Sequence, residues 1–363
     1  MSGRALRIHP RRIQASGPNG LGSRAPCLSA KQLGQSSLAR GFGLAQPLSR
    51  RSITVPPVLP SFLATFFFAL NATCANHSIR LLGTLRANLS RLVIGTLGLA
   101  LFAHTVGGGF TSAGTGWFLL SGVIGLGIGD LGTYGALPLL GSQLTVLMVQ
   151  CIGAPVAALG EWWWLGTRLS TPQVVCGTAI LGGVALAIAP SRSHPAEVRI
   201  RPLGFVYGLV GALGQGLGAA LVSRKGVMVA VAAGESVSNV TFGLTAAYQR
   251  LLAGLAFTSL WFLALRLLRR LPKEPPAGAQ VGRAPWLWTV ANGIAGPLAG
   301  VSCYQWALAT VPSGVVLPIV ATTPLLCIPI AYKLEGVRPT RRSIVGGVIA
   351  VIGCAVLGIV SRR

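Results

Sequence analysis

The stretch Gly125–Leu137, GLGIGDLGTYGAL, decides between two very different folds. Gly127, Gly129 and Gly132 follow the G-x-G-x-x-G spacing of a dinucleotide-binding turn, which needs a strand before it and a helix after it in a soluble βαβ unit. Here the glycines lie inside one long apolar run that also carries a single carboxylate, Asp130. These surroundings favour a membrane-spanning helix whose glycines form a packing surface.

The composition of the chain supports a membrane protein. Of 363 residues, 52% are hydrophobic and only 10% are charged, whereas about 25% are charged in an ordinary soluble protein. The formal net charge is +24, but the basic residues lie in the N-terminal tail and in short gaps between apolar runs rather than on a soluble face. We therefore expect a lipid bilayer, and no nucleic acid, as the partner of this chain.

The seven cysteines are scattered and none forms a C-x-x-C pair. This spacing favours small core residues over a metal site or a disulfide scaffold. The sequence accordingly predicts no metal and no cofactor, and it predicts no particular oligomeric state.

The N-terminal segment, residues 1–52, is basic, free of acids and rich in Ser, Gly and Pro. Such a segment cannot pack a core, so we expect it to be a disordered tail. It is similar to an organelle transit peptide. A translation start assigned too far upstream is the alternative, and both interpretations remain open.

From Val58 onward, the chain contains about ten runs of the length that a membrane helix needs, about 20 mostly apolar residues. Continuous apolar runs without alternation argue against a β-barrel. The runs lie near residues 58–77, 90–108, 116–137, 141–162, 171–190, 203–222, 245–267, 286–308, 313–333 and 343–361.

The second half of the chain repeats features of the first half at a shift of 170 residues. Tyr134 corresponds to Tyr304, and Gly183 corresponds to Gly353. A separate match pairs RLVIG, which begins at Arg91, with RLLAG, which begins at Arg250 at a different shift. With about five spans in each half, the second half would cross the membrane in the opposite direction, as in the inverted repeats of many secondary transporters.

These features resemble the EamA-type group of the drug/metabolite transporter superfamily. The pattern comprises an Ala-Leu near the end of one span, a Pro in the next span, a short turn with an Arg, and then spaced glycines. In this sequence it is carried by Ala136-Leu137, Pro155, Arg168, Gly177 and Gly183, and again by Ala307-Leu308, Pro324, Arg338, Gly347 and Gly353. The glutamate of the family's turn is replaced by Thr167 and Val337, so no Glu–Arg pair is assumed there.

The resemblance implies an all-α membrane protein with about ten transmembrane helices in two inverted five-helix repeats, residues 58–190 and 203–361. It implies a secondary transporter that moves a small metabolite or drug-like solute by alternating access, with proton coupling as an additional hypothesis. We expect the plasma (inner) membrane, or an organelle membrane if the tail is a transit peptide. The alternative is a non-transporting multi-pass membrane enzyme or scaffold, for which the sequence offers no H-E-x-x-H, G-x-S-x-G or P-loop motif.

Asp130 is the main candidate for the site, because an acid inside a span usually faces a cavity. It could exchange protons or bind a cationic group, and Tyr134 lies one turn away on the same helix face. Gln215, Tyr304 and Gln305 are further candidates for substrate binding or coupling. Pro155 and Pro324 are predicted to kink their spans.

The resemblance also places Arg91 and Arg250 at the start of the second span of each repeat. Counting loop charges with the N-terminus inside assigns Arg91 to an outer loop and Arg250 to an inner loop. The resemblance implies that both termini lie in the cytoplasm, and we keep this orientation as the expectation. The loop charges of residues 58–361 favour the opposite orientation by the positive-inside rule, and only the basic tail redresses the count. The run Glu161–Trp164 predicts an aromatic belt at the membrane interface.

Overall fold

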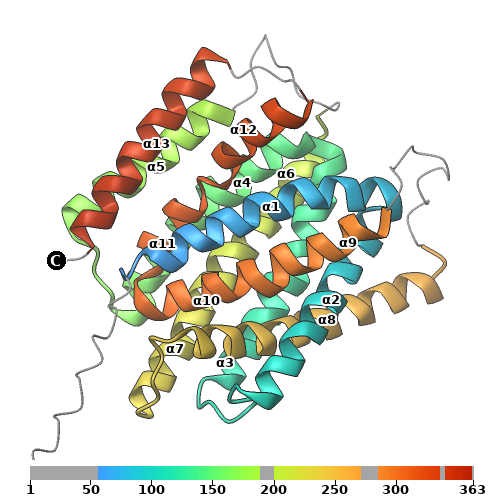
Figure 1. Cartoon of the computed structure of the whole chain (residues 1–363). Helices are drawn as coiled ribbons and strands as arrows, with labels where there is room; N and C mark the ends of the chain where they lie inside the picture. The colour runs from blue at the N-terminus through green and yellow to red at the C-terminus, as the bar shows by residue number, and fades with distance from the viewer. Residues whose placement is uncertain (1–55, 189–199, 271–284, 336–339, 362–363) are drawn as a thin grey trace, which may run out of the picture. The chain divides into compact units, whose positions relative to one another are not determined.

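The computed structural model describes residues 56–188, 200–270, 285–335 and 340–361 (Figure 1). The predicted tail, residues 1–52, and the turn arginine Arg338 lie outside these ranges. Within them every regular element is helical and no strand occurs. The prediction of an all-α protein is confirmed for the described residues, and the dinucleotide-binding βαβ unit has no counterpart around Gly125–Leu137.

Two sets of helices are separated by residues 189–199. The first set is α1 (Leu59–Leu82), α2 (Thr84–Thr105), α3 (Thr115–Gly122), the π-helical η1 (Val123–Gly129), α4 (Asp130–Leu165) and α5 (Thr171–Ile188). The second set is α6 (Pro202–Leu213), η2 (Gly214–Val222), α7 (Ser223–Ala232), α8 (Val240–Leu267), α9 (Pro285–Gly293), η3 (Ile294–Gly300), α10 (Val301–Thr310), α11 (Ser313–Val320), α12 (Thr323–Glu335) and α13 (Arg341–Val360).

Seven helical segments of the described chain are long and apolar enough to cross a membrane. They are Thr84–Thr105, Thr115–Leu140, Leu144–Leu165, Thr171–Ile188, Pro202–Ala232, Val240–Leu267 and Arg341–Val360. The chain is therefore a multi-pass membrane protein. The remaining apolar runs of the sequence coincide with α1, with residues 285–310 and with the interrupted pair α11 and α12. The count of ten stays a prediction.

The order of the contacts with α6 and η2 reverses between Leu140 and Gly153. Along η1 and the first part of α4 up to Leu140, successive contacts move backward along η2 and α6, and from Gly153 onward they move forward again. In order along the chain, these contacts join Gly125 to Ala219, Gly132 to Gly211, Leu140 to Gly204, Gly153 to Gln215 and Gly160 to Leu221. The two parts of α4 thus belong to two different crossings, as the separate runs 116–137 and 141–162 predict.

The glycines of the opening stretch allow close helix packing. They lie in η1 and at the start of α4, where a Cβ on Gly129 would be 2.9 Å from the Cα of Gly214. A Cβ on Gly127 would be 2.7 Å from the ring of Phe257. Only glycine permits these approaches, so the G-x-G-x-x-G spacing reflects packing between helices.

Helices α5 and α13 lie side by side and run antiparallel (Figure 1). Gly183 packs on Ala350, and Gly353 packs on Ile180. Adding 170 to Gly183 gives Gly353, and adding 170 to Ile180 gives Ala350. The contact of Gly183 in α5 with Ala350 in α13 therefore corresponds to the contact of Gly353 in α13 with Ile180 in α5.

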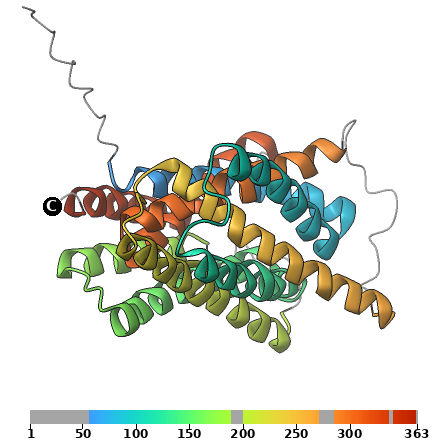
Figure 2. The same ribbon diagram turned by 90° about the horizontal axis from the view of Figure 1, so that it is seen from below.

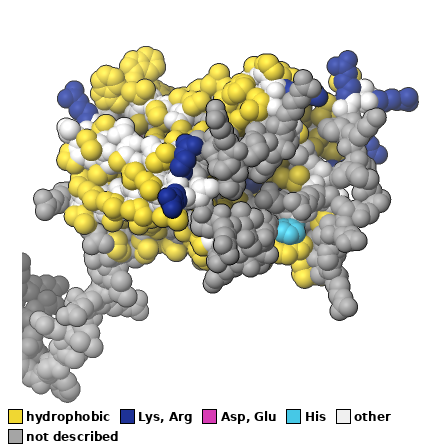
Figure 3. Space-filling view, turned by 90° about the horizontal axis from the view of Figure 1, so that it is seen from above, with side chains coloured by type: hydrophobic (Ala, Val, Ile, Leu, Met, Phe, Trp, Pro, Cys, Tyr) yellow, Lys and Arg dark blue, Asp and Glu magenta, His cyan; other side chains and the backbone are white. Residues whose placement is uncertain are grey.

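The long helix α8 crosses other helices obliquely in the view from below (Figure 2). It packs against α2, α3, η1 and α10, and so joins elements from both sets. Hydrophobic side chains make up most of the coloured surface in Figure 3, with Lys and Arg in small separate groups. An apolar surface of this kind suits contact with lipid.

Candidate functional site

Asp130 forms an ion pair with Arg91 of α2. The Arg91 Nη2 donates to Asp130 Oδ2, and its Nε donates to Asn88 Oδ1 at 2.8 Å. The Arg91 guanidinium also lies 5.3 Å from the centroid of the Tyr134 ring, a cation–π distance. The side chains of Arg91 and Asp130 are only 10% and 20% exposed. The predicted acid is therefore present inside the helices, and its charge is already paired.

The structure corrects the placement of the two arginines. Both were expected at span starts and counted with the loops, but Arg91 lies within α2, and Arg250 lies well inside α8. Both helices begin five or six residues before the expected apolar runs 90–108 and 245–267. Burial beside a carboxylate lets a guanidinium continue the helix where hydropathy alone would end it.

Arg250 is one of the largest fully buried side chains, at 1% exposure. Its Nε and Nη1 have no hydrogen-bond partner in the described part of the chain. Among the described ionisable groups, Tyr304 and Asp130 interact electrostatically with its guanidinium. Arg250 and Tyr304 thus correspond to Arg91 and Tyr134, and one carboxylate, Asp130, lies near both arginines.

The other predicted site residues are distributed unevenly around this cluster. Tyr304 is buried at 2% exposure with its hydroxyl unpartnered, and the Gln305 amide is fully buried with both polar atoms unpartnered in the described structure. Gln215 is half-buried beside Gly153, and no contact joins it to the arginines. The structure therefore brings Asp130, Tyr134 and Tyr304 together through Arg91 and Arg250.

The two predicted kink prolines have different surroundings. Pro155 lies inside α4 with an exposed ring. Pro324 lies in the first turn of α12, directly after the break at residues 321–322 that separates α11 from α12. A first-turn proline has no intrahelical bond to lose. At Pro324 the span is interrupted before the proline rather than bent at it.

Two π-helical segments occupy corresponding positions in the two sets. Adding 170 to η1 (Val123–Gly129) gives 293–299, and η3 spans Ile294–Gly300. π-Helical turns occur frequently at functional sites because they shift side chains that follow them. Here η1 ends directly before Asp130. The residue that corresponds to Asp130 by the same shift is Gly300.

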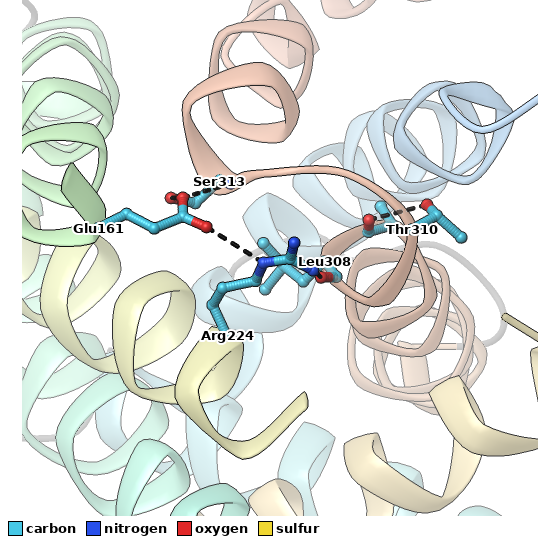
Figure 4. A network of polar contacts seen from close by, with 6 residues as sticks. Glu161, Arg224, Leu308, Thr310 and Ser313 are labelled. Atoms are coloured by element: carbon cyan, nitrogen blue, oxygen red, sulfur yellow. Dashed lines mark hydrogen bonds and ion pairs between the residues drawn. The ribbon is translucent and has the colours of Figure 1, made fainter. Parts of the chain in front are cut away.

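A second buried acid, Glu161, joins several helices (Figure 4). Its Oε1 accepts from Arg224 Nε at 3.1 Å, and its Oε2 accepts from the Ser313 backbone N–H at 2.7 Å and from the Ser313 hydroxyl. Arg224 Nη1 donates to the Leu308 carbonyl at 2.5 Å. We call Glu161, Arg224, Leu308 and Ser313 the polar latch.

The polar latch uses the helix ends that it connects. The carboxylate of Glu161 meets the N-terminus of α11 at Ser313, and the guanidinium of Arg224 meets the C-terminal turn of α10 at Leu308. Both charges have the sign that the helix dipoles favour. Sequence reasoning missed this cluster, because Glu161 was grouped with the exposed Trp162–Trp164 belt. The available signal was a glutamate that still lies within the expected apolar run 141–162, one residue before its end.

Within the described residues no group of three or more His, Cys, Asp or Glu is placed to hold a metal ion. Two apolar surface grooves are present, one between α1, α2 and α9 and one between α12 and α13. Neither groove is lined by Asp130 or by the two buried arginines.

Residues 206–359 match the model of the EamA-like transporter family. The resemblance predicted from the sequence is confirmed for this part of the chain. The comparison with curated proteins gave no match. A solved structure described only as "Crystal structure of protein" is similar over 85% of this chain and 98% of its own, with 18% identity and a TM-score of 0.62. At that identity it shows a shared fold alone.

Proposed function

We propose that this chain is a secondary transporter that moves a small solute across a membrane by alternating access. The observation that carries the proposal is the exchanged pair of contacts between α5 and α13, Gly183 with Ala350 and Gly353 with Ile180. Corresponding helices that run antiparallel and exchange contacts are what two halves of opposite orientation produce. Inverted halves of this kind enclose a site and rock around it.

The repeats that we propose are residues 58–190 and 203–361, each with five crossings. The seven apolar spans and the helices of residues 59–82, 285–310 and 313–335 together supply ten. The position of Gly358, whose added Cβ would lie 3.6 Å from Val58, supports an even number of crossings, because the first and last helices meet at one end.

The substrate and coupling site that we propose is the cluster around Arg91, Asp130 and Arg250. These residues come from three apolar spans, Thr84–Thr105, Thr115–Leu140 and Val240–Leu267, and each lies inside its span. Tyr134 and Tyr304 supply an aromatic ring and a hydroxyl beside the charges. Gln305 is retained as a candidate because its buried amide has no partner in the described structure. Gln215 is supported only by its half-buried position beside α4.

Proton coupling through Asp130 is the finer part of the proposal. A proton on Asp130 would remove the charge that holds Arg91, and it would leave two buried guanidiniums without a carboxylate. The arrangement of α2, α4 and α8 would then change in energy with protonation, which is what coupling requires.

The polar latch is the gate that fits this mechanism. It joins α4 of the first half to α7, α10 and α11 of the second half near one end of the helices. Alternating access requires such contacts to form in one state and to separate in the other.

The test is solute movement in vesicles that contain the purified full chain. Vesicles loaded with a defined mixture of metabolites should lose one class of solute faster than protein-free vesicles, and a proton gradient should alter the rate. Asp130→Asn should abolish the gradient dependence. The enzyme and scaffold alternatives predict the same retention with and without the protein. Fractionated cells would test the proposed plasma (inner) membrane location.

A further inference from the structure

The two halves of the cluster carry different charges. In the first half, Arg91 has Asp130 and Asn88 as partners. In the second half, the residue at the position of Asp130 is Gly300, so Arg250 has no counterpart of Asp130. Arg91, Arg250 and Asp130 together carry one net positive charge.

This excess charge is deeply buried. Arg250 is 1% exposed, and two of its guanidinium nitrogens have no partner within the described chain. An unpaired guanidinium out of water is strongly unfavourable, so it needs an anion. Glu161 cannot serve, since its two oxygens are already engaged by Arg224 and Ser313.

From this geometry we propose that Arg250 binds an anionic group, a carboxylate or a phosphate, on the transported solute. The planar guanidinium presents parallel N–H donors that match either group. The buried Tyr304 hydroxyl, which has no partner in the described structure and interacts electrostatically with Arg250, provides a further donor. The proposal rests on the proposed transport function and names the substrate class of that same site.

The arrangement argues against a cation as the substrate. Asp130 is the carboxylate that a cationic group would need, but Arg91 occupies it and Arg250 lies within its electrostatic range. A cation would have to displace a buried arginine. An anion instead completes the charge balance of the site.

The experiment uses vesicles that contain the full chain, loaded with a defined mixture of carboxylates, sugar phosphates, neutral sugars and quaternary amines. Mass spectrometry of the retained solutes identifies the class that leaves. We expect carboxylates or phosphates to leave, and separate loading with each group distinguishes the two sources of the anion. Arg250→Gln should slow this efflux at least ~10-fold, because a charge-assisted hydrogen bond is lost.

Arg266→Gln is the matched control, because Arg266 lies on the same helix but is exposed. It removes the same charge and should leave efflux unchanged. Loss of only neutral sugars or amines would overturn the anion assignment and leave the transport function standing. No loss of any class beyond protein-free vesicles would overturn the transport function and the assignment with it.

A thermal measurement separates binding from a structural role. Without solute, Arg250→Gln should melt at the same temperature as the unaltered chain or higher, since it removes an unpaired buried charge. A rise in melting temperature with inorganic phosphate or lactate should occur in the unaltered chain and in Arg266→Gln, and be lost in Arg250→Gln. A large fall in the melting temperature of Arg250→Gln without solute would assign the arginine to the fold and overturn the proposal. Arg250→Lys keeps the positive charge but loses the paired N–H donors of the guanidinium. Phosphate or lactate should therefore raise its melting temperature only slightly.

Discussion

Arg91 and Asp130 form an ion pair between α2 and α4, and Arg250 lies within electrostatic range of the same carboxylate. Among the described residues, Asp130 is thus hydrogen-bonded to one buried arginine, Arg91, and only interacts electrostatically with the other, Arg250. Because of this asymmetry, removing Asp130 and removing Arg91 should change the stability of the protein by different amounts.

Asp130→Asn should destabilise the protein more than Arg91→Gln does. The first change leaves two guanidiniums without a carboxylate, whereas the second leaves Asp130 beside Arg250. We expect a loss of about 3 kcal/mol for Asp130→Asn, the lower end for a broken buried pair, because Asp130 retains partial exposure. Thermal unfolding of the detergent-solubilised chain, followed by tryptophan fluorescence, measures the difference.

The double variant Arg91→Gln/Asp130→Asn is the control for this pair. It removes both charges and should recover most of the stability lost in Asp130→Asn. Equal melting temperatures for Asp130→Asn and Arg91→Gln would contradict the shared-acid arrangement.

Opening of the polar latch should expose the end of the helices that it closes. Glu161→Ala leaves Arg224 without its carboxylate and the N-terminus of α11 without its acceptor. Ser223, fully buried against Ser121, is a reporter position. In a cysteine-free background, Ser223→Cys should react slowly with a membrane-impermeant thiol reagent and at least several-fold faster after Glu161→Ala.

Glu235→Ala provides the comparison for the latch variant. Glu235 accepts from the Ala113 backbone N–H between two connecting segments, outside the latch. Its loss should leave the reactivity of the Ser223→Cys reporter nearly unchanged. Similar acceleration in both variants would mean that the latch has no specific gating role.

The sequence predicts the helical fold well, because its apolar runs are long and uninterrupted. The helices at residues 171–188 and 341–360 coincide with the runs expected at 171–190 and 343–361. The reading of Gly129 as packing surface also agrees with its approach to Gly214. These features depend on local composition, which hydropathy captures directly.

The site could be predicted only in part. Asp130 stands out because it is alone among apolar residues, but its partner depends on how α2 packs against α4. The loop-charge count places Arg91 and Arg250 in loops because both lie near the first residues of their expected apolar runs, 90–108 and 245–267. Glu161 was likewise hidden beside exposed tryptophans. Ion pairs that cancel inside the helices leave no local trace in the sequence.

Gly183 and Gly182 offer a direct test of the packing between α5 and α13. A Cβ on Gly183 would lie 2.6 Å from the Gly346 carbonyl oxygen, whereas a Cβ on Gly182 would meet nothing within 4 Å. Gly183→Ala should therefore cost about 1–3 kcal/mol of stability by overpacking. Gly182→Ala should be neutral or slightly stabilising, because alanine favours a helix. The unfolding midpoints of Gly183→Ala and Gly182→Ala measure this difference in stability.

The same comparison can be made in the partner helix. A Cβ on Gly346 would be 2.7 Å from the backbone nitrogen of Ala187, and a Cβ on Gly347 would be in open space. Gly346→Ala should match Gly183→Ala in its effect, and Gly347→Ala should match Gly182→Ala. The counterpart of Gly183 at the 170-residue shift is Gly353, whose added Cβ would lie 2.7 Å from Ile180. Unequal effects of Gly183→Ala and Gly353→Ala would argue against an equivalent role of the two helices.

Inverted repeats make a definite prediction about which connections share a side of the membrane. Ser170, between α4 and α5, and Ser236, between α7 and α8, should lie on one side, whereas Ile200 and Arg270 should lie on the other. All four are exposed. Single cysteines at these positions in a cysteine-free chain should react with an impermeant reagent from opposite sides in these two pairs. Labelling of Ser170→Cys and Arg270→Cys from the same side would exclude the ten-crossing arrangement. The side on which the Ser170 pair reacts also fixes the orientation, which the loop charges and the family resemblance predict in opposite ways.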